Sequence, residues 1–221
     1  SSNGLEQNNR VASSLARGRG NAFNNQFTDK GLYRSMSRFQ IKESPIDGLR
    51  IIERKPLADE RGYLERMFCD EELEAIVGSR RIVQINRTLT SRGGVVRGMH
   101  YQHPPHAEMK IVSCLRGEVF DVAVDLRQDS PTFLNWHAEI LTEENYRSLA
   151  IPEGFAHGFQ TLTDNCELLY LHTAAYEMGA EDGLDSLDPR LSVNRPKAIT
   201  ERSFRDQKLC QIASGFRGIS I

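Results

Sequence analysis

A strictly alternating stretch limits this chain to β-structure more firmly than any other feature. In Glu118–Leu126 every second residue is apolar, and Asp121 and Asp125 fall on the opposite face. A period of two is that of an extended strand. The apolar segment Lys110–Leu115 precedes it, separated only by Arg116-Gly117. Two strands joined by so short a turn predict a β-hairpin.

Short segments with the pattern of β-strands continue through the rest of the chain. Four more short strands are predicted, at Trp136–Leu141, Tyr146–Ile151, Phe159–Thr163 and Glu167–Ala175. The one good helix candidate in the first half is Asp70–Val77. Many short strands separated by turn residues are typical of a β-sandwich or a β-barrel. The predicted fold is therefore all-β with a few short helices.

The first 35 residues differ in composition from the remainder. They are rich in Asn, Ser, Gly and Arg, and their apolar residues follow no period. Such a segment buries too little apolar surface to offset its ordering entropy. We expect residues 1–35 to be a disordered extension or an expression leftover before Met36, with a native ordered arm as the alternative. Residues 36–221 are expected to form one domain.

Composition and charge exclude several classes of protein. The net charge is −2, or −5 without the basic first 35 residues, which argues against a dedicated nucleic-acid binder. No apolar run reaches the ~18 residues of a transmembrane helix, and the N-terminus lacks a secretory apolar region. The four cysteines lie 45, 52 and 44 residues apart, typical of free thiols in a reducing compartment. A cytoplasmic protein is expected.

Four of the six histidines fall in two clusters, at residues 97–110 and 151–158. The second cluster contains Pro152-Glu-Gly154-Phe-Ala-His157, a spacing characteristic of the second motif of cupin domains. Proline presets the turn and glycine relieves its sterics, so the histidine should point into the mouth of a small barrel.

The cupin metal site has only partial support here. It needs a His-x-His pair and a nearby glutamate, but His100 and His103 are three residues apart and fall on opposite faces of a regular strand. Glu108 lies in an irregular stretch after Pro104-Pro105. We therefore expect neither a metal nor another cofactor.

Several segments together resemble the dTDP-4-dehydrorhamnose 3,5-epimerase family. They are Arg97-Gly-Met-His-Tyr-Gln102, Gly117–Arg127, Ser130-Pro-Thr-Phe133, Ile151–Gly158 and Glu167-Leu-Leu-Tyr170, within a similarity that runs from about Phe39 to about Leu209. The resemblance implies a cupin-type double-stranded β-helix, or jelly-roll barrel. It also implies inversion of the carbons that flank the C4 ketone of a dTDP-linked 4-keto-6-deoxy-sugar.

That reaction needs a base, a proton donor on the opposite face of the sugar and a cation for the enolate oxygen. The resemblance implies that His100 is the base, with Asp206 holding its other nitrogen. It implies that Tyr170 is the acid and that Lys110 lies beside the keto oxygen. Because Tyr170 and Tyr176 share the parity of one strand, both are expected to face one cavity.

The resemblance also implies a set of substrate-binding residues and a homodimer. The set comprises Arg61, Gln84, Asn86, Arg97, His157, Tyr176, Glu181 and Arg205. Tyr176 matches the aromatic residue that stacks on thymine, and Arg61 would reach the neighbouring subunit through an exchanged N-terminal strand. Arg97 and His100 are three residues apart, so both can face inward only if the strand is irregular between them. A β-bulge at Gly98 would supply that irregularity.

Three departures from the family pattern concern the nucleotide end. Ile85 stands where an aspartate is usual, Arg66 where a glutamate is usual, and Arg205 where a lysine is usual. They concern the identity of the nucleotide and sugar rather than the proton-transfer residues. Because the same His–Tyr pair could serve either reaction, a single-centre epimerase, acting at C3 or C5 alone, is a close alternative. A metal-dependent cupin enzyme and a non-catalytic sugar-nucleotide binder are the remaining hypotheses.

Overall fold

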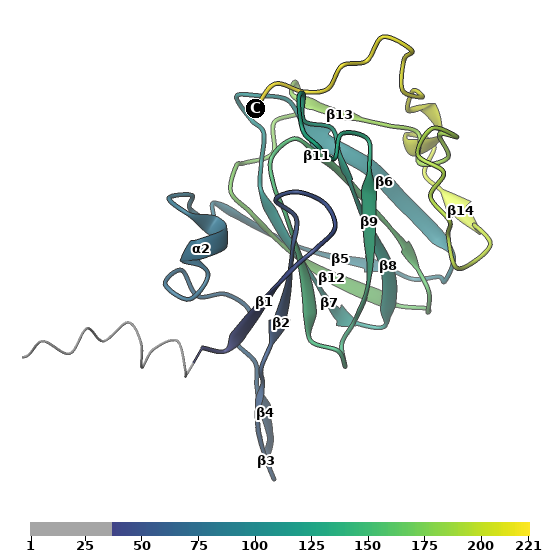
Figure 1. Cartoon of the computed structure of the whole chain (residues 1–221). Helices are drawn as coiled ribbons and strands as arrows, with labels where there is room; N and C mark the ends of the chain where they lie inside the picture. Colours follow the sequence, from purple (N-terminus) through teal and green to yellow (C-terminus); the bar gives the residue numbers. More distant parts are fainter. Residues whose placement is uncertain (1–36) are drawn as a thin grey trace, which may run out of the picture. The chain divides into compact units, whose positions relative to one another are not determined.

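Two antiparallel sheets contain most of the regular structure of residues 37–221, which are the part of the chain that the computed structural model describes (Figure 1). The first sheet has the order β1 (Phe39–Glu43), β2 (Arg50–Arg54), β10 (Arg147–Ile151), β7 (Lys110–Arg116), β12 (Cys166–His172) and β5 (Gln84–Thr90). The second has the order β13 (Glu181–Gly183), β6 (Val95–Gln102), β11 (Phe155–Thr161), β8 (Glu118–Asp125) and β9 (Trp136–Thr142).

The remaining elements are short. β14 (Glu201–Arg202) pairs in parallel with β6, and β3 (Leu57–Asp59) and β4 (Gly62–Leu64) form a separate hairpin. The described helices are α2 (Glu74–Val77) and the 3-10 helix η1 (Asp206–Lys208). Two packed antiparallel sheets with so little helix confirm the predicted all-β jelly-roll fold. The expectation for residues 1–35 lies outside the described residues.

The hairpin predicted around Gly117 is wrong. β7 pairs with β10 and β12, whereas β8 pairs with β11 and β9, so the two strands belong to different sheets. Gly117 turns the chain from one sheet to the other with φ +76°, and a Cβ there would lie 2.6 Å from Thr163 Oγ1. Each strand gains two neighbours in this way, which suits segments that are apolar on both faces.

Two strand boundaries also differ from the prediction. β11 begins at Phe155, four residues earlier than expected, because its ladder with β8 starts directly after the Gly154 turn. His157 therefore lies within a strand. β12 ends at His172 rather than Ala175, since Thr173 already bonds to the backbone of Met109 and the chain leaves the sheet.

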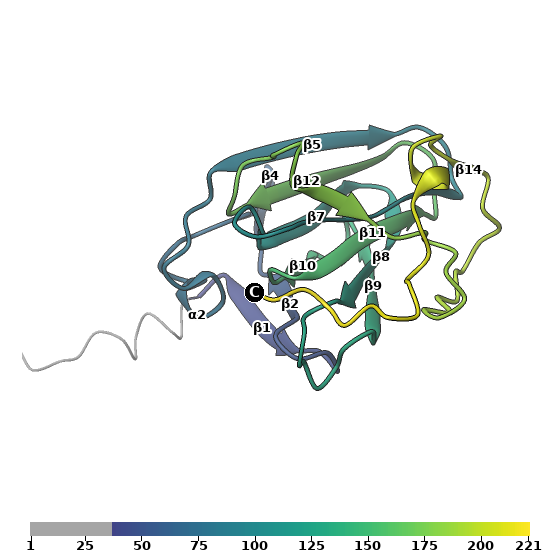
Figure 2. The same ribbon diagram turned by 90° about the horizontal axis from the view of Figure 1, so that it is seen from above.

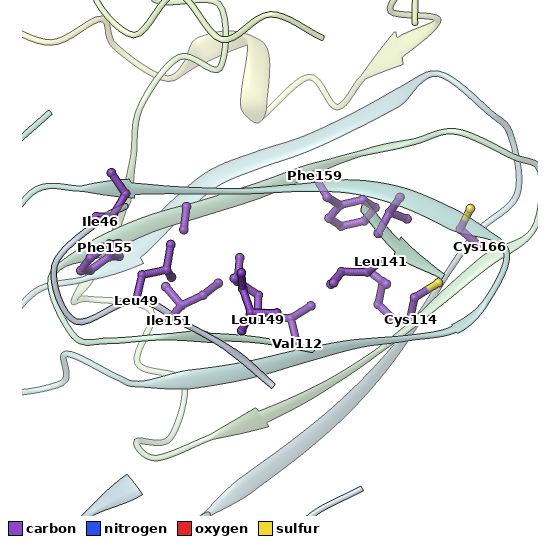
Figure 3. Close-up of a cluster of buried hydrophobic side chains, with 14 residues drawn as sticks. Ile46, Leu49, Val112, Cys114, Leu141, Leu149, Ile151, Phe155, Phe159 and Cys166 are labelled. Carbon is purple, nitrogen blue, oxygen red and sulfur yellow. The ribbon is translucent and has the colours of Figure 1, made fainter. Parts of the chain in front are cut away.

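An apolar cluster of 14 buried residues lies in the space between the two sheets. Figure 3 shows the side chains of this cluster filling the gap between strands of the two sheets. Leu149 and Val112 come from the first sheet and Phe155 and Phe159 from the second, and all four are almost fully buried. Burial of such side chains stabilises the fold by about 1.5–3 kcal/mol each.

The outer faces of both sheets are covered as well. The segment that includes α2 packs Leu73 and Val77 against the first sheet, and residues 184–219 pack over β6, β8 and β11. The alternation in β8 therefore does not separate core from solvent, because Asp121 and Asp125 are fully buried too. β5 remains at the edge of the first sheet, next to β12, which separates it from β7 (Figure 2).

Candidate active site

A pocket of about 590 Å³ is lined by strands of both sheets and by the C-terminal segment. Ten of the predicted site residues line it: Asn86, Arg97, His100, Lys110, His157, Tyr170, Tyr176, Glu181, Arg205 and Asp206. They come from β5, β6, β7, β11, β12 and β13, from η1 and from loop positions 176 and 205, so segments far apart in sequence meet at one site.

Arg61 and Gln84 are the two predicted residues that do not line the pocket. Arg61 lies in the turn between β3 and β4, where its side chain is 86% exposed and pairs with Asp59. Gln84 lies next to the pocket, and its Oε1 accepts a hydrogen bond from the backbone N–H of Tyr176 at 3.0 Å. Gln84 thus holds the loop that carries Tyr176.

The bulge expected at Gly98 is present in β6. The pairing of β6 with β11 shifts register between His157 and Phe159, and Gly98 has φ +107°. A Cβ at Gly98 would lie 2.6 Å from the Cα of Gly158, so only glycine fits. The irregularity allows Arg97 and His100 to line the same pocket although they are three residues apart.

His100 and Asp206 form a hydrogen-bonded pair, as predicted. Nε2 of His100 lies 2.9 Å from Oδ1 of Asp206, and Oδ2 of Asp206 accepts the backbone N–H of Gly98 at 3.3 Å. Burial raises the pKa of Asp206, but the hydrogen bond and charge of His100 and the Gly98 N–H outweigh it and hold the pKa below its usual range. Because Asp206 is a carboxylate, Nε2 carries the hydrogen and Nδ1 keeps its lone pair.

Tyr170 enters the pocket from β12, in the sheet opposite the one that carries His100. Its ring lies 6.1 Å, between centroids, from that of His157 and 6.0 Å from that of His172. Burial raises the pKa of the Tyr170 phenol, and the negative charge of Asp121 adds to this rise. The phenol therefore keeps its proton in the folded protein.

His157 has a carboxylate partner that sequence reasoning missed. Its Nε2 lies 3.0 and 2.9 Å from the two carboxylate oxygens of Asp121, which is fully buried. The signal was visible, since Asp121 is an acid inside an apolar strand segment. The alternation in β8 indicated only that Asp121 and Phe120 lie on opposite faces of the strand. The contact with His157 depends on how β11 pairs with β8, which the sequence did not reveal.

Glu108 and His172 also line the pocket and were not predicted as site residues. Glu108 Oε1 lies 2.8 Å from Lys110 Nζ, and Glu108 Oε2 lies 2.7 Å from His172 Nδ1. Burial raises the pKa of Glu108, but the hydrogen bond from His172 and the charge of Lys110 outweigh it and bring the pKa to about 2. Glu108 is therefore a buried carboxylate that holds two nitrogen donors.

The far end of the pocket is more open. Tyr176 is 51% exposed, and its hydroxyl donates to Glu181 Oε2 at 2.6 Å. Arg205 Nη2 lies 2.5 Å from Glu181 Oε1. Burial raises the pKa of Glu181, but the hydrogen bonds from Tyr176 and Arg205 lower it overall. An aromatic surface and a cation thus stand side by side, as recognition of a nucleotide requires.

Two of the three departures from the family pattern lie away from the pocket. Ile85 is on the outer face of β5 and 62% exposed, and Arg66 pairs with Glu72 near α2. Within one chain, these two changes therefore do not touch the pocket. Strand parity explains Ile85, because Asn86 next to it takes the inward position. Arg205 alone lies at the pocket.

No group of three or more His, Cys, Asp or Glu side chains with the geometry of a metal site occurs in residues 37–221. In the same stretch of chain, no helix is both long enough and apolar enough to span a bilayer. Carboxylates hold the nitrogen donors of the pocket: Asp206 holds His100, Asp121 holds His157, and Glu108 holds both Lys110 and His172.

Fold and pocket together define a cupin-type protein whose interior presents titratable side chains from two facing sheets. Comparison with known proteins narrows this class. Residues 43–214 match the family described as dTDP-4-dehydrorhamnose 3,5-epimerase. The chain belongs to this family, which confirms the predicted membership and makes the protein an enzyme of the isomerase class.

Individual relatives agree with the family match. The dTDP-4-dehydrorhamnose 3,5-epimerase of Shigella flexneri is 42% identical over 76% of this chain and 94% of its own length. The dTDP-4-dehydrorhamnose 3-epimerase of Streptomyces niveus is 38% identical over 79% of this chain and 84% of its own. A crystal structure of dTDP-6-deoxy-D-glucose-3,5-epimerase from Legionella pneumophila in complex with dTDP-4-keto-L-rhamnose superimposes with a TM-score of 0.74 at 40% identity, covering 78% of this chain and 92% of that one.

Proposed function

We propose that this enzyme inverts C3, C5 or both in a dTDP-4-keto-6-deoxy-hexose, with His100 as base and Tyr170 as acid. One observation carries the proposal: the imidazole and the phenol come from opposite sheets and line one pocket. Inversion needs a base on one face of the sugar ring and a proton donor on the other. A solved relative at 40% identity, crystallised with dTDP-4-keto-L-rhamnose, supports this substrate class.

The first step is removal of a proton from the carbon next to the ketone. Nδ1 of His100 has the free lone pair, because Nε2 is bound to Asp206. As the C–H bond breaks, its electrons pass to the C4 oxygen and form an enolate. Asp206 stabilises the resulting imidazolium in the same way that it fixes the tautomer of the neutral ring.

The second step adds a proton to the opposite face of the same carbon. Tyr170 Oη–H supplies that proton, and its raised pKa keeps the phenol protonated until the enolate forms. The Lys110 ammonium, which is nearly buried, stabilises the enolate oxygen. The product returns to a ketone with the configuration of that carbon inverted. The residues that carry these steps act without a cofactor.

The nucleotide binds at the open end of the pocket. Tyr176 stacks on the thymine, and Arg205 and Arg97 contact the pyrophosphate, with Asn86 and Glu181 as further polar contacts and His157 beside the sugar. Stacking on an aromatic ring is worth about 1–3 kcal/mol per base, so this end contributes affinity rather than chemistry.

The test is proton exchange with dTDP-4-keto-6-deoxyglucose in D2O, followed by NMR. Deuterium at C3 and C5 with inversion at both supports double epimerisation. Deuterium at neither carbon, in protein that still binds dTDP, would overturn the proposal in favour of a non-catalytic sugar-nucleotide binder. Activity that disappears with removal of a stoichiometric metal would favour a metal-dependent cupin enzyme.

A single-centre epimerase is the second candidate. The relative from Streptomyces niveus, named as a 3-epimerase, is 38% identical, which is within the range of the double epimerases. The same His–Tyr pair serves either reaction, because both carbons flank the same ketone. Deuterium and inversion at one carbon only, after complete turnover, would establish this reading.

We propose further that the protein is a homodimer in which Arg61 of each chain reaches the other chain's pocket. β5 is an edge strand that carries two exposed apolar side chains, Ile85 and Leu89, an arrangement that a second copy would cover. The β3–β4 hairpin extends from the sheets and bears Arg61 at its turn (Figure 1).

An activated sugar with two phosphate charges does not cross a bilayer unaided, which supports the cytoplasmic location predicted above.

Light scattering on Ile85→Lys tests the dimer. A charge on the covered face should convert the dimer to a monomer and reduce activity, because each pocket then lacks Arg61 of the other chain. Lys42→Ala, on the opposite edge strand β1, is the control. A parent protein that is monomeric at assay concentration with full activity would contradict the proposal.

A further inference from the structure

Two buried polar residues of the pocket have no role in the reaction described above. The Glu108 side chain is 9% exposed and His172 is 8% exposed, so both are largely removed from solvent. A buried carboxylate is stabilising only where its desolvation is compensated by partners. Glu108 has two such partners, Lys110 and His172, and His172 has a second partner of its own.

The register of the first sheet places His172 between the two ends of the pocket. Across three neighbouring strands, His172 of β12 lies opposite Lys110 of β7 on one side and opposite Gln84 of β5 on the other. Its Nε2 lies 3.3 Å from the side-chain amide nitrogen of Asn86. Lys110, Glu108, His172 and Asn86 thus form a continuous hydrogen-bonded row along one wall.

The two contacts of His172 determine its tautomer. Glu108 is a carboxylate and only accepts, so Nδ1 must carry the hydrogen. Nε2 then accepts from the Nδ2–H of Asn86, which requires a neutral imidazole and turns Oδ1 of Asn86 away from the ring. This arrangement of hydrogens satisfies every member of the row.

We propose that Glu108 and His172 are positioning residues: Glu108 aims the Lys110 ammonium at the sugar carbonyl, and neutral His172 holds Glu108 on one side and the Asn86 amide on the other. The part that concerns the carbonyl rests on the function proposed above. When the enolate forms, Lys110 turns one N–H toward the new negative charge, and the Nδ1–H of His172 keeps the Glu108 carboxylate partnered. The sugar end and the nucleotide end then share one fixed wall.

Two substitutions at His172 separate the branches of this row. In His172→Asn the amide nitrogen takes the place of Nδ1 and can still donate to Glu108, but the contact with Asn86 is lost. In His172→Gln the terminal amide takes the place of Nε2 and can still accept from Asn86, but the contact with Glu108 is lost. The two variants are similar in size and polarity, so they form a matched pair.

The expected kinetic result is a split between the two variants. His172→Gln should lose at least tenfold more kcat than His172→Asn, with the affinity for dTDP nearly that of the parent. His172→Asn should weaken dTDP binding by about threefold or more. His137→Gln, which removes a histidine from the Glu139 pair outside the pocket, is the control for loss of a His–Glu contact. Equal losses of kcat and of dTDP affinity in both variants would mean a merely structural role and overturn the proposal.

Glu108→Gln tests whether the two residues act through one path. Once Glu108 has lost its charge, adding His172→Gln should cost less than threefold more in kcat, whereas independent roles would multiply. Multiplying losses in the double variant would contradict the proposal.

Nitrogen NMR of histidine-labelled protein gives a readout that needs no activity. In the parent, His172 should have the signals of a neutral ring with hydrogen on Nδ1, and Glu108→Gln should shift it toward the Nε2–H form. If the parent shows these signals but turns over no keto-sugar, the proposed function fails and the hydrogen-bonded row stands. If His172 is charged or carries hydrogen on Nε2 in the parent, the row itself is wrong.

Discussion

The two ends of the pocket are built differently. At the sugar end, His100, Lys110 and Tyr170 stand on long strands, and each side chain is held by buried neighbours. At the nucleotide end, Tyr176 and Arg205 stand on loops and are about half exposed. Rigid strands give the precision that proton transfer needs, whereas binding tolerates side chains that adjust to the ligand. The predictions below test this contrast.

The largest effect is expected at the sugar end. His100→Ala and Tyr170→Phe should each lower kcat by about 10³-fold, because each removes one of the two proton-transfer groups. Calorimetric affinity for dTDP should stay within about twofold of the parent, since both residues are away from the nucleotide. His103→Ala, at the end of the same strand but outside the pocket, serves as control. Near-parent turnover by both variants would refute the assigned roles.

A smaller loss is expected when the partner of the base is changed. Asp206→Asn removes the charge that fixes the His100 tautomer and stabilises the imidazolium, so kcat should fall by about 10²-fold. KM should change little, which steady-state kinetics can measure directly. A rise in KM with unchanged kcat would place Asp206 in substrate binding and blur the contrast between the two ends.

The nucleotide end should respond in KM instead. Tyr176→Ala should raise KM and the dissociation constant of dTDP about tenfold, as expected for loss of one stacking contact, with kcat within about threefold. Met178→Ala, an exposed residue two positions further on, should leave both parameters unchanged. If Tyr176→Ala instead abolishes kcat, the two ends are not separable.

The smallest effect concerns stability in acid. Glu108 has a pKa of about 2 in the folded protein against 4.5 in the unfolded chain. Its contribution is therefore complete above pH 4.5 and is lost as the pH falls through 4.5 toward 2. Denaturant unfolding at pH 7 and pH 3 gives the free energy of unfolding that each protein loses between these two pH values. This loss should be about 1 kcal/mol smaller in Glu108→Gln than in the parent.

The matched variant at the other end is Glu181→Gln. Glu181 also has a lowered pKa, but its partners Tyr176 and Arg205 are exposed, so its effect on the acid sensitivity should be smaller than that of Glu108→Gln. The reverse order would show that burial of the partners does not distinguish the two ends.

Most of the pocket could be predicted from the sequence because short motifs resemble those of a known family. His100, Lys110, His157 and Tyr170 were all predicted and all line one pocket. Pairwise contacts were harder to predict. Asp121, Glu108 and His172 carry ordinary signals in the sequence, and their partners come from other strands. These contacts depend on the order of the strands in the sheets, which no local sequence pattern encodes.

The sequence by itself determined the family and the all-β class, since periodicity and motifs are local properties of the chain. The tertiary structure decided that β7 and β8 belong to different sheets and that β8 is buried on both faces. It also decided that Ile85 faces away from the pocket and that His172 joins Lys110 to Asn86 through Glu108. These features depend on the register between strands that are far apart in the chain. That register is set by packing on both faces of each sheet, which is complete only when the whole domain has folded.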